Sequence, residues 1–119
     1  MLTPATLEAL LQFRRERDWE QFHNFRSQAI SISLEAAELL EHVQWTPDTE
    51  LRAAVFEPDG RVKEAVAQEV ADIAMYLSLL AHDLGLDLDA AVQKKLALNR
   101  ERYPVDKAHG KSTKYTKLG

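Results

Sequence analysis

The sequence predicts an all-α fold, a bundle of four to five helices that oligomerises through its two long central helices. Three features of the pattern lead to this class. Apolar residues recur three and four positions apart along two long segments, as they do on one face of a helix. No segment has the alternation of a β-strand. The four prolines and two of the four glycines stand where helical segments begin or end.

The first part of the chain contains two predicted helices. Thr3 and Pro4 suit the cap and first turn of a helix that runs to about Asp18. The stretch DWEQFHNF then indicates a bend or a short linker. Asn24 within this stretch is a candidate cap for a long helix over 25–45.

The middle of the chain adds a short helix and a second long one. Pro47 precedes a helix predicted over 48–56, and EPDG at 57–60 has the residues of a turn. The second long helix runs over 61–84 and ends at Gly85, a residue that suits the left-handed position after a helix.

The last predicted helix begins after Asp87, its cap, and stops before Pro104. Four lysines and no acid follow in KAHGKSTKYTK. We therefore predict one domain over 1–104 and a basic tail over 105–119. The tail is either disordered or becomes ordered when substrate binds.

Both long helices are apolar over too much of their circumference for a small monomer. Each has an apolar seam, and small residues on the opposite face of the second helix let another helix approach closely. The seams are Phe25, Ala29, Ile32, Ala36, Leu39 and Val43 in the first helix and Val66, Val70, Ile73, Leu77, Leu80 and Leu84 in the second. We therefore expect a homo-oligomer.

The composition excludes several classes of protein. The 119 residues include no cysteine, so disulfide bonds and thiolate metal sites are excluded. The net charge of −4 argues against nucleic-acid binding. No apolar run approaches the roughly 20 residues that span a bilayer, and the N-terminus lacks the basic start of a signal peptide. We expect a cytoplasmic protein that binds neither nucleic acid nor membrane.

Four acids interrupt the apolar sides of the long helices. Glu35 and Glu38 are three residues apart in LEAAELL, and Glu69 and Asp72 have the same spacing in QEVADI. Residues so spaced face the same way, so two facing helices would bring four carboxylates together. Burial and mutual repulsion make such a group unfavourable unless a divalent cation binds it. Oxygen ligands alone favour Mg²⁺, with Mn²⁺ as a substitute, over zinc.

Two other interpretations of these acids remain open. Acid pairs are common on solvated helix faces, so the group could be incidental in a helical scaffold or binding protein. A di-iron carboxylate site would need two E-x-x-H motifs beside the glutamates. The chain has one, from Glu20 to His23.

Four further segments accompany the acids in order: RERDWEQFHNFR at 15–26, HVQW at 42–45, KLALNRERYP at 95–104 and HGKSTKYTKL at 109–118. With the two acid pairs, they resemble the MazG-like all-α nucleoside triphosphate pyrophosphohydrolases, in particular the branch of dCTP pyrophosphatases. The resemblance covers about residues 10–118.

The resemblance implies hydrolysis of a nucleoside triphosphate between its α and β phosphates, giving a monophosphate and pyrophosphate. It implies that Glu35, Glu38, Glu69 and Asp72 are metal ligands and catalytic residues, and that the protein is a tetramer built as a dimer of dimers. The implied substrate is dCTP or a 5-modified dCTP, with dUTP or a broad set of nucleotides as the alternative. The role is sanitation of the nucleotide pool.

Eleven further residues are expected to bind the nucleotide. Aromatic side chains can stack on a base, and cationic ones can bind phosphate oxygens. The tail residues among them lie in the family-like KYT. The predicted residues are Trp19, His23, Arg26, Trp45, Tyr76, Lys95, Asn99, Arg102, Tyr103, Lys114 and Tyr115. Core packing would equally explain the tryptophans and Tyr76, and a solvated surface would explain the cations.

Overall fold

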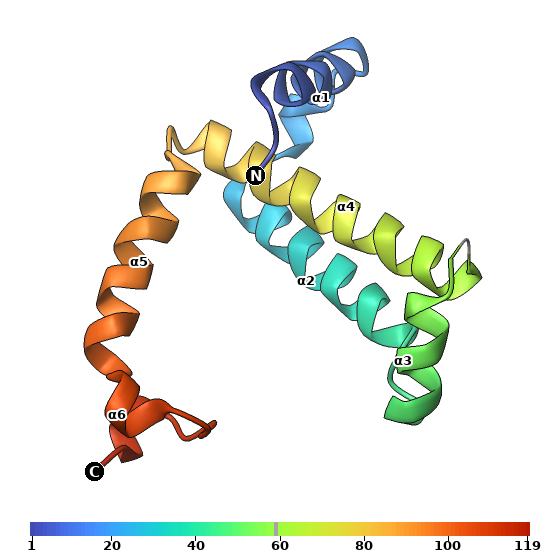
Figure 1. Cartoon of the computed structure of the whole chain (residues 1–119). Helices are drawn as coiled ribbons and strands as arrows, with labels where there is room; N and C mark the ends of the chain where they lie inside the picture. The colour runs from blue at the N-terminus through green and yellow to red at the C-terminus, as the bar shows by residue number, and fades with distance from the viewer. Residues whose placement is uncertain (59) are drawn as a thin grey trace. The chain divides into compact units, whose positions relative to one another are not determined.

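The computed structural model describes residues 1–58 and 60–119, and all regular secondary structure in them is helical. The prediction of an all-α protein is therefore confirmed (Figure 1). The chain divides into two compact units, Met1–Leu84 and Gly85–Gly119, which are described separately below.

The first unit is built around two long antiparallel helices, α2 and α4, which lie side by side in Figure 1. His42, the residue that follows α2, is fourteen positions after Gln28, and Asp83 is fourteen positions after Glu69 on α4. Gln28 bonds to Asp83, and His42 bonds to Glu69. The elements of the unit are α1 (Pro4–Glu16), the 3-10 turn η1 (Glu20–Phe22), α2 (Phe25–Glu41), α3 (Asp48–Phe56) and α4 (Arg61–Asp83).

The predicted caps position these helices. The Thr3 hydroxyl accepts from the N–H of Thr6 at 3.2 Å, and the Asn24 side chain accepts from that of Ser27 at 2.9 Å. Each bond satisfies a backbone donor that the helix leaves without a partner. Gly85 has a φ of +65°, the left-handed conformation that glycine adopts after a helix.

Helix α2 ends at Glu41, whereas the sequence predicted a helix to residue 45. Residues 42–45 form a turn instead, in which Gln44 donates its backbone N–H to the carbonyl of Leu40 at 2.8 Å. Pro47 disfavours the helical conformation for Thr46, so the helix cannot continue through this turn into α3. The turn predicted at 57–60 includes Asp59, which lies outside the described residues.

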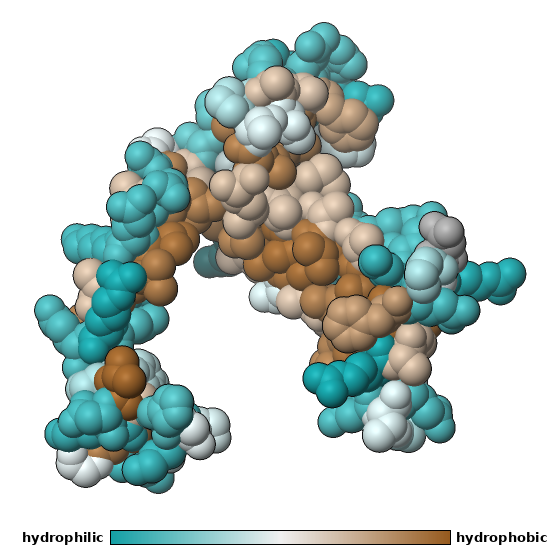
Figure 2. Space-filling view, in the orientation of Figure 1, coloured by the Kyte–Doolittle hydropathy of each residue, from teal (hydrophilic) through white to brown (hydrophobic). Residues whose placement is uncertain are grey.

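The first unit has a small core. Among the described residues, the buried apolar side chains are Leu11, Leu79 and Ala81, and the buried polar ones are Arg14, Gln28 and Ser78. Large apolar side chains of α2 remain exposed, including Ile30 at 52% and Leu34 at 58%. Figure 2 shows apolar residues gathered over α2. One copy of the chain therefore leaves much of the predicted apolar surface uncovered.

The second unit contains α5 (Leu88–Arg102), α6 (Val105–Ala108) and the 3-10 turn η2 (Tyr115–Lys117). Asp87 caps α5 as predicted, accepting from the N–H of Ala90 at 3.0 Å. The Tyr115 ring lies 4.6 Å from the guanidinium carbon of Arg102 and 5.9 Å, centroid to centroid, from the ring of Tyr103. These contacts hold η2 against the end of α5.

None of the described helices combines the length and the apolar composition needed to cross a membrane.

Candidate active site

Three carboxylates meet between α2 and α4. Glu35 comes from α2, while Glu69 and Asp72 lie one turn apart on α4. One oxygen of each lies within 4.8 Å of the others. The antiparallel pairing of the helices creates this group, which we call the acid group, because it brings the polar stripes of the two helices face to face.

The acid group contains charge without a matching partner. One carboxylate oxygen of Glu35 and one of Glu69, Oε2 in each case, are buried and make no hydrogen bond. Burial raises the pKa of Glu35, and the negative charges of Glu38, Asp72 and Glu69 raise it further. Unpartnered, mutually repelling oxygens are what a hard divalent cation would satisfy. The residues therefore fit a metal ion.

Glu38 and His42 lie at the edge of the acid group. Glu38 is exposed, and its carboxylate adds to the field that raises the pKa of Glu35. His42 Nε2 lies 3.2 Å from Glu69 Oε1. His23, the histidine of the single E-x-x-H motif, is not part of the metal-ligand group among the described residues. The arrangement therefore gives no support to the di-iron interpretation.

A pocket of about 250 Å³ lies beside the acid group. Its walls are mainly aromatic and aliphatic. The polar groups are the side chains of Arg14 and His23 and the carboxylates of Glu35 and Asp72. Its lining residues are Leu10, Phe13, Arg14, Trp19, His23, Glu35, Asp72, Met75, Tyr76 and Leu79. The pocket thus joins two members of the acid group, Glu35 and Asp72, to three of the residues expected to bind nucleotide: Trp19, His23 and Tyr76.

Aromatic contacts fix the pocket walls. The Phe13 and Trp19 rings meet edge to face, with centroids 5.7 Å apart. The His23 and Tyr76 rings meet at 6.3 Å and 63°. Trp19 remains 44% exposed, so core packing does not cover the whole of its side chain. These walls suit a flat apolar ring with polar edges, such as a nucleobase.

The other predicted nucleotide-binding residues lie elsewhere in the chain. Arg26 is exposed near the start of α2, and Trp45 is 86% exposed in the turn after it. The remaining six belong to the second unit. They are Lys95, Asn99 and Arg102 on α5, Tyr103 directly after it, Lys114, and Tyr115 in η2.

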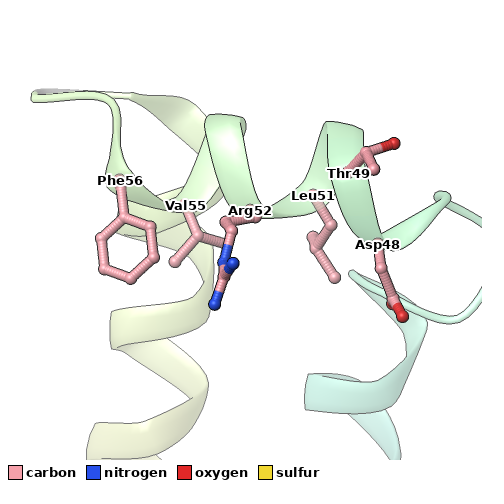
Figure 3. Close-up of a pocket in the computed structure, with 6 residues that line it drawn as sticks. All are labelled: Asp48, Thr49, Leu51, Arg52, Val55 and Phe56. Atoms are coloured by element: carbon pink, nitrogen blue, oxygen red, sulfur yellow. The ribbon is translucent and has the colours of Figure 1, made fainter.

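Helix α3 carries a larger but shallower hollow of about 540 Å³. Figure 3 shows that its lining side chains, including Leu51, Arg52 and Phe56, project from a single helix. It lacks the converging elements and the grouped acids of the pocket beside Glu35. We therefore place the candidate site at the acid group.

A buried ion pair beside the pocket was not predicted. Two guanidinium nitrogens of Arg14 bind the two carboxylate oxygens of Asp83, each at 2.8 Å, and Gln28 Nε2 donates to Asp83 Oδ2 at 2.8 Å. The hydrogen bond from Arg14 holds the pKa of Asp83 below its usual range. Burial and the nearby charge of Arg14 lower the pKa of His23.

The sequence contained a signal for part of this network. Gln28 continues the polar stripe of Glu35 toward the start of α2, and Asp83 continues that of Asp72 toward the end of α4. Both therefore face the neighbouring helix. No pattern in the sequence pointed to Arg14, which lies in a run of charged residues on α1.

Comparisons with known proteins show the family of the chain. The MazG-like family matches residues 30–118. The chain is 42% identical over 107 residues to dCTP pyrophosphatase 1 of Bos taurus and 40% identical to the Homo sapiens protein of that name. Each match covers 90% of this chain. The crystal structure of a pyrophosphatase from Archaeoglobus fulgidus is 37% identical, with a TM-score of 0.76, covering 84% of this chain and 90% of that one.

The chain spans 62% of the length of these curated relatives.

Proposed function

Since the chain belongs to the MazG-like family, we propose that it is a metal-dependent nucleoside triphosphate pyrophosphohydrolase. The substrate is dCTP, or a 5-modified dCTP, and the products are dCMP and pyrophosphate. The name of the mammalian relatives, dCTP pyrophosphatase 1, supports this substrate. The cellular role is sanitation of the nucleotide pool in the cytoplasm.

One observation carries the proposal: the acid group, in which two buried carboxylate oxygens lack a hydrogen-bond partner, opens onto an aromatic pocket. Glu35 and Asp72 belong to both. A nucleotide seated in the pocket would have its base among the aromatic rings and its phosphates near the acids. Carboxylates alone would repel a triphosphate, so this arrangement needs a cation between the two sets of charges.

The cation that we propose is Mg²⁺, with Mn²⁺ as a substitute. When bound, it neutralises the triphosphate and stabilises the charge that develops as the bond between the α and β phosphates breaks. Glu35, Glu69 and Asp72 would bind the cation, and the exposed Glu38 would be the fourth ligand. His42, bonded to Glu69, fixes the orientation of that carboxylate.

Within the pocket, Trp19 and Tyr76 provide the surfaces on which the base stacks, and His23 contacts the base. Stacking depends on a π face rather than on hydrogen bonds, so it gives affinity more than selectivity. The acids at the same cavity fix where the triphosphate lies. The pocket therefore orients the bond to be broken.

We also propose that Arg26, Trp45 and the six residues of the second unit bind the nucleotide. Their chemistry supports this role, because guanidinium and ammonium groups bind phosphate oxygens. Tyr115 in the basic tail stacks with Arg102 at the end of α5, and this contact holds the two side chains together. On this proposal, residues 1–104 form the pyrophosphohydrolase domain, and residues 105–119 form a basic tail that becomes ordered when substrate binds.

The protein is proposed to act as a homo-oligomer, a tetramer arranged as a dimer of dimers. Support comes from the small core of the first unit and the exposed apolar residues of α2. On α5, Val92 and Leu96 are exposed by nearly half, and Figure 2 shows an apolar band along that helix. A second copy of the chain would cover such surfaces.

The test is product analysis. Incubating the protein with a panel of deoxynucleoside triphosphates and resolving the products by ion exchange should give dCMP and pyrophosphate from dCTP only when Mg²⁺ is present. Release of a diphosphate and phosphate would show cleavage of the wrong bond. Absence of turnover with every nucleotide would leave the scaffold interpretation.

Substitution of Trp19 by alanine is expected to raise the KM for dCTP about tenfold or more, because stacking on a base contributes about 1–3 kcal/mol. The kcat should change less, since the acids that act on the phosphates remain in place. Steady-state kinetics with Phe56→Ala as a matched control measures the effect. Phe56 is an exposed aromatic residue, 74% accessible, away from the pocket. Equal KM values for the two variants would remove Trp19 from the base site.

A further inference from the structure

Arg14, which lines the pocket, is held in place by an ion pair with Asp83. Arg14 is only 5% exposed, and both ends of its guanidinium group are bound to Asp83. Gln28, 1% exposed, donates to the same carboxylate. Three elements, α1, α2 and α4, thus fix one cation in one orientation.

His23 lies next to this fixed cation. Nη1 of Arg14 is 3.5 Å from Nδ1 of His23. Arginine can only donate hydrogen bonds, so this nitrogen of His23 must be the acceptor. A neutral histidine that accepts at Nδ1 carries its proton at Nε2. Burial and the charge of Arg14 lower the pKa of His23, which favours this neutral form.

We propose that Arg14, held by Asp83 and Gln28, is a positioning residue that presents His23 to the pocket as an Nε2–H donor for an acceptor atom of a nucleobase. The proposal rests on the proposed function, since it assigns the pocket to the base. Arg14 does not touch the substrate in this role. It determines which hydrogen bond His23 can make.

The fixed donor has a consequence for base selection. The pairing edge of cytosine offers two adjacent acceptors, N3 and O2, whereas N3 of uracil carries a hydrogen and cannot accept. A donor that cannot reverse its polarity and that is directed at N3 forms a hydrogen bond with cytosine but meets the N3–H of uracil, so two hydrogens oppose each other. A histidine free to change tautomer would tolerate both bases. The ion pair therefore contributes selectivity as well as affinity.

The first test is the tautomer of His23, observed by nitrogen-15 NMR of the side chain. The signals are assigned by comparison with His23→Gln. In the native protein, the Nε2–H form is expected to dominate. In Arg14→Met, the preference for the Nε2–H tautomer should be lost, and the pKa of His23 should rise. The positive charge of Arg14 is then gone, while the negative charges of Asp83 and Glu20 still favour the protonated ring.

Arg15→Met is the matched control. Arg15 is the next residue, and it makes an exposed ion pair with Glu8 at 2.8 Å. Its removal is expected to leave the tautomer unchanged. Where Arg14→Met does not fold, Arg14→Met/Asp83→Leu removes the ion pair as a unit and should lose the same preference. An unchanged tautomer in the folded variant would overturn the proposal.

The second test is kinetic. Loss of one well-placed hydrogen bond to the base is expected to lower kcat/KM for dCTP about tenfold, through KM, in Arg14→Met and in His23→Leu. The preference for dCTP over dUTP should fall in parallel. His23→Gln, whose amide can donate from a similar place, should recover part of the activity. Equal kinetics for Arg14→Met and Arg15→Met would contradict the positioning role.

The proposed function and the positioning role of Arg14 can be disproved separately. If the native protein does not hydrolyse dCTP, the proposed function fails, but the NMR measurement still decides whether Arg14 fixes the tautomer. Addition of dCMP without metal should then also leave the His23 signals unshifted. If dCTP is hydrolysed and the tautomer does not depend on Arg14, the positioning role alone is wrong.

Discussion

Replacing Glu35 by glutamine is expected to lower the rate of pyrophosphate release from dCTP about a thousandfold, because the electrostatic stabilisation of the phosphates depends on the cation that Glu35 holds. The same change should raise the melting temperature of the metal-free protein at neutral pH. Burial and neighbouring acids raise the pKa of Glu35, so its ionisation opposes folding, and a neutral amide removes that repulsion. Thermal unfolding with and without Mg²⁺ should show the stabilising shift in the native protein and its loss in the variant.

Glu41→Gln is the matched control for this prediction. Glu41 lies on the same helix, is exposed and is not part of the acid group. It should retain both the activity and the response to Mg²⁺. Full activity in Glu35→Gln would show that the acid group is not the metal site. A lower melting temperature in EDTA would show that the carboxylate has a structural partner.

The second large effect concerns stability. Asp83→Ala is expected to lower the free energy of unfolding by about 3 kcal/mol or more, because it leaves the buried guanidinium of Arg14 without a counter-charge. Glu8→Gln removes a partner from an ion pair of the same 2.8 Å length, but its side chains are 65% and 51% exposed. That loss should stay below about 1 kcal/mol. Denaturant unfolding of the two variants tests whether burial of an ion pair, rather than the distance between its atoms, determines its contribution to stability.

The stabilising effect of Asp83 should also depend on pH. Arg14 holds the folded-state pKa of Asp83 below the 3.8 of an unperturbed aspartate. A depressed pKa contributes stability that is complete above the unfolded value and is lost as the pH falls through the folded one. The difference between native protein and Asp83→Asn should therefore be constant near neutral pH and shrink below about 3.8. A difference that grows on acidification would contradict the ion pair.

The helices could be predicted because their signals are local. Thr3, Asn24, Asp87 and Gly85 each act on backbone groups within a few residues, so their roles follow from sequence spacing. The end of α2 was predicted four residues too late, because residues 42–45 ahead of Pro47 form a turn instead of a last helical turn. The acid pairs could likewise be placed on one side of each helix from their spacing.

The ion pair beside the pocket could not be predicted in the same way. Arg14 and Asp83 are 69 residues apart, and their contact depends on where α1 crosses α4. Charged residues at such positions are usually solvated, so composition gives no reason to pair these two. Only the packing of three helices shows that Arg14 is buried and that His23 lies beside it.

The common register of α2 and α4 restricts how the length of the chain can vary. One residue inserted into α2 between Gln28 and Glu35 would rotate one of these side chains by about 100° relative to the other. The acid group and the ion pair could then not both face α4. Insertions in the turn at 42–47 would leave each helical stripe intact. We therefore expect homologous chains to differ in length at the connections, and to keep the fourteen-residue spacing from Gln28 to His42 and from Glu69 to Asp83.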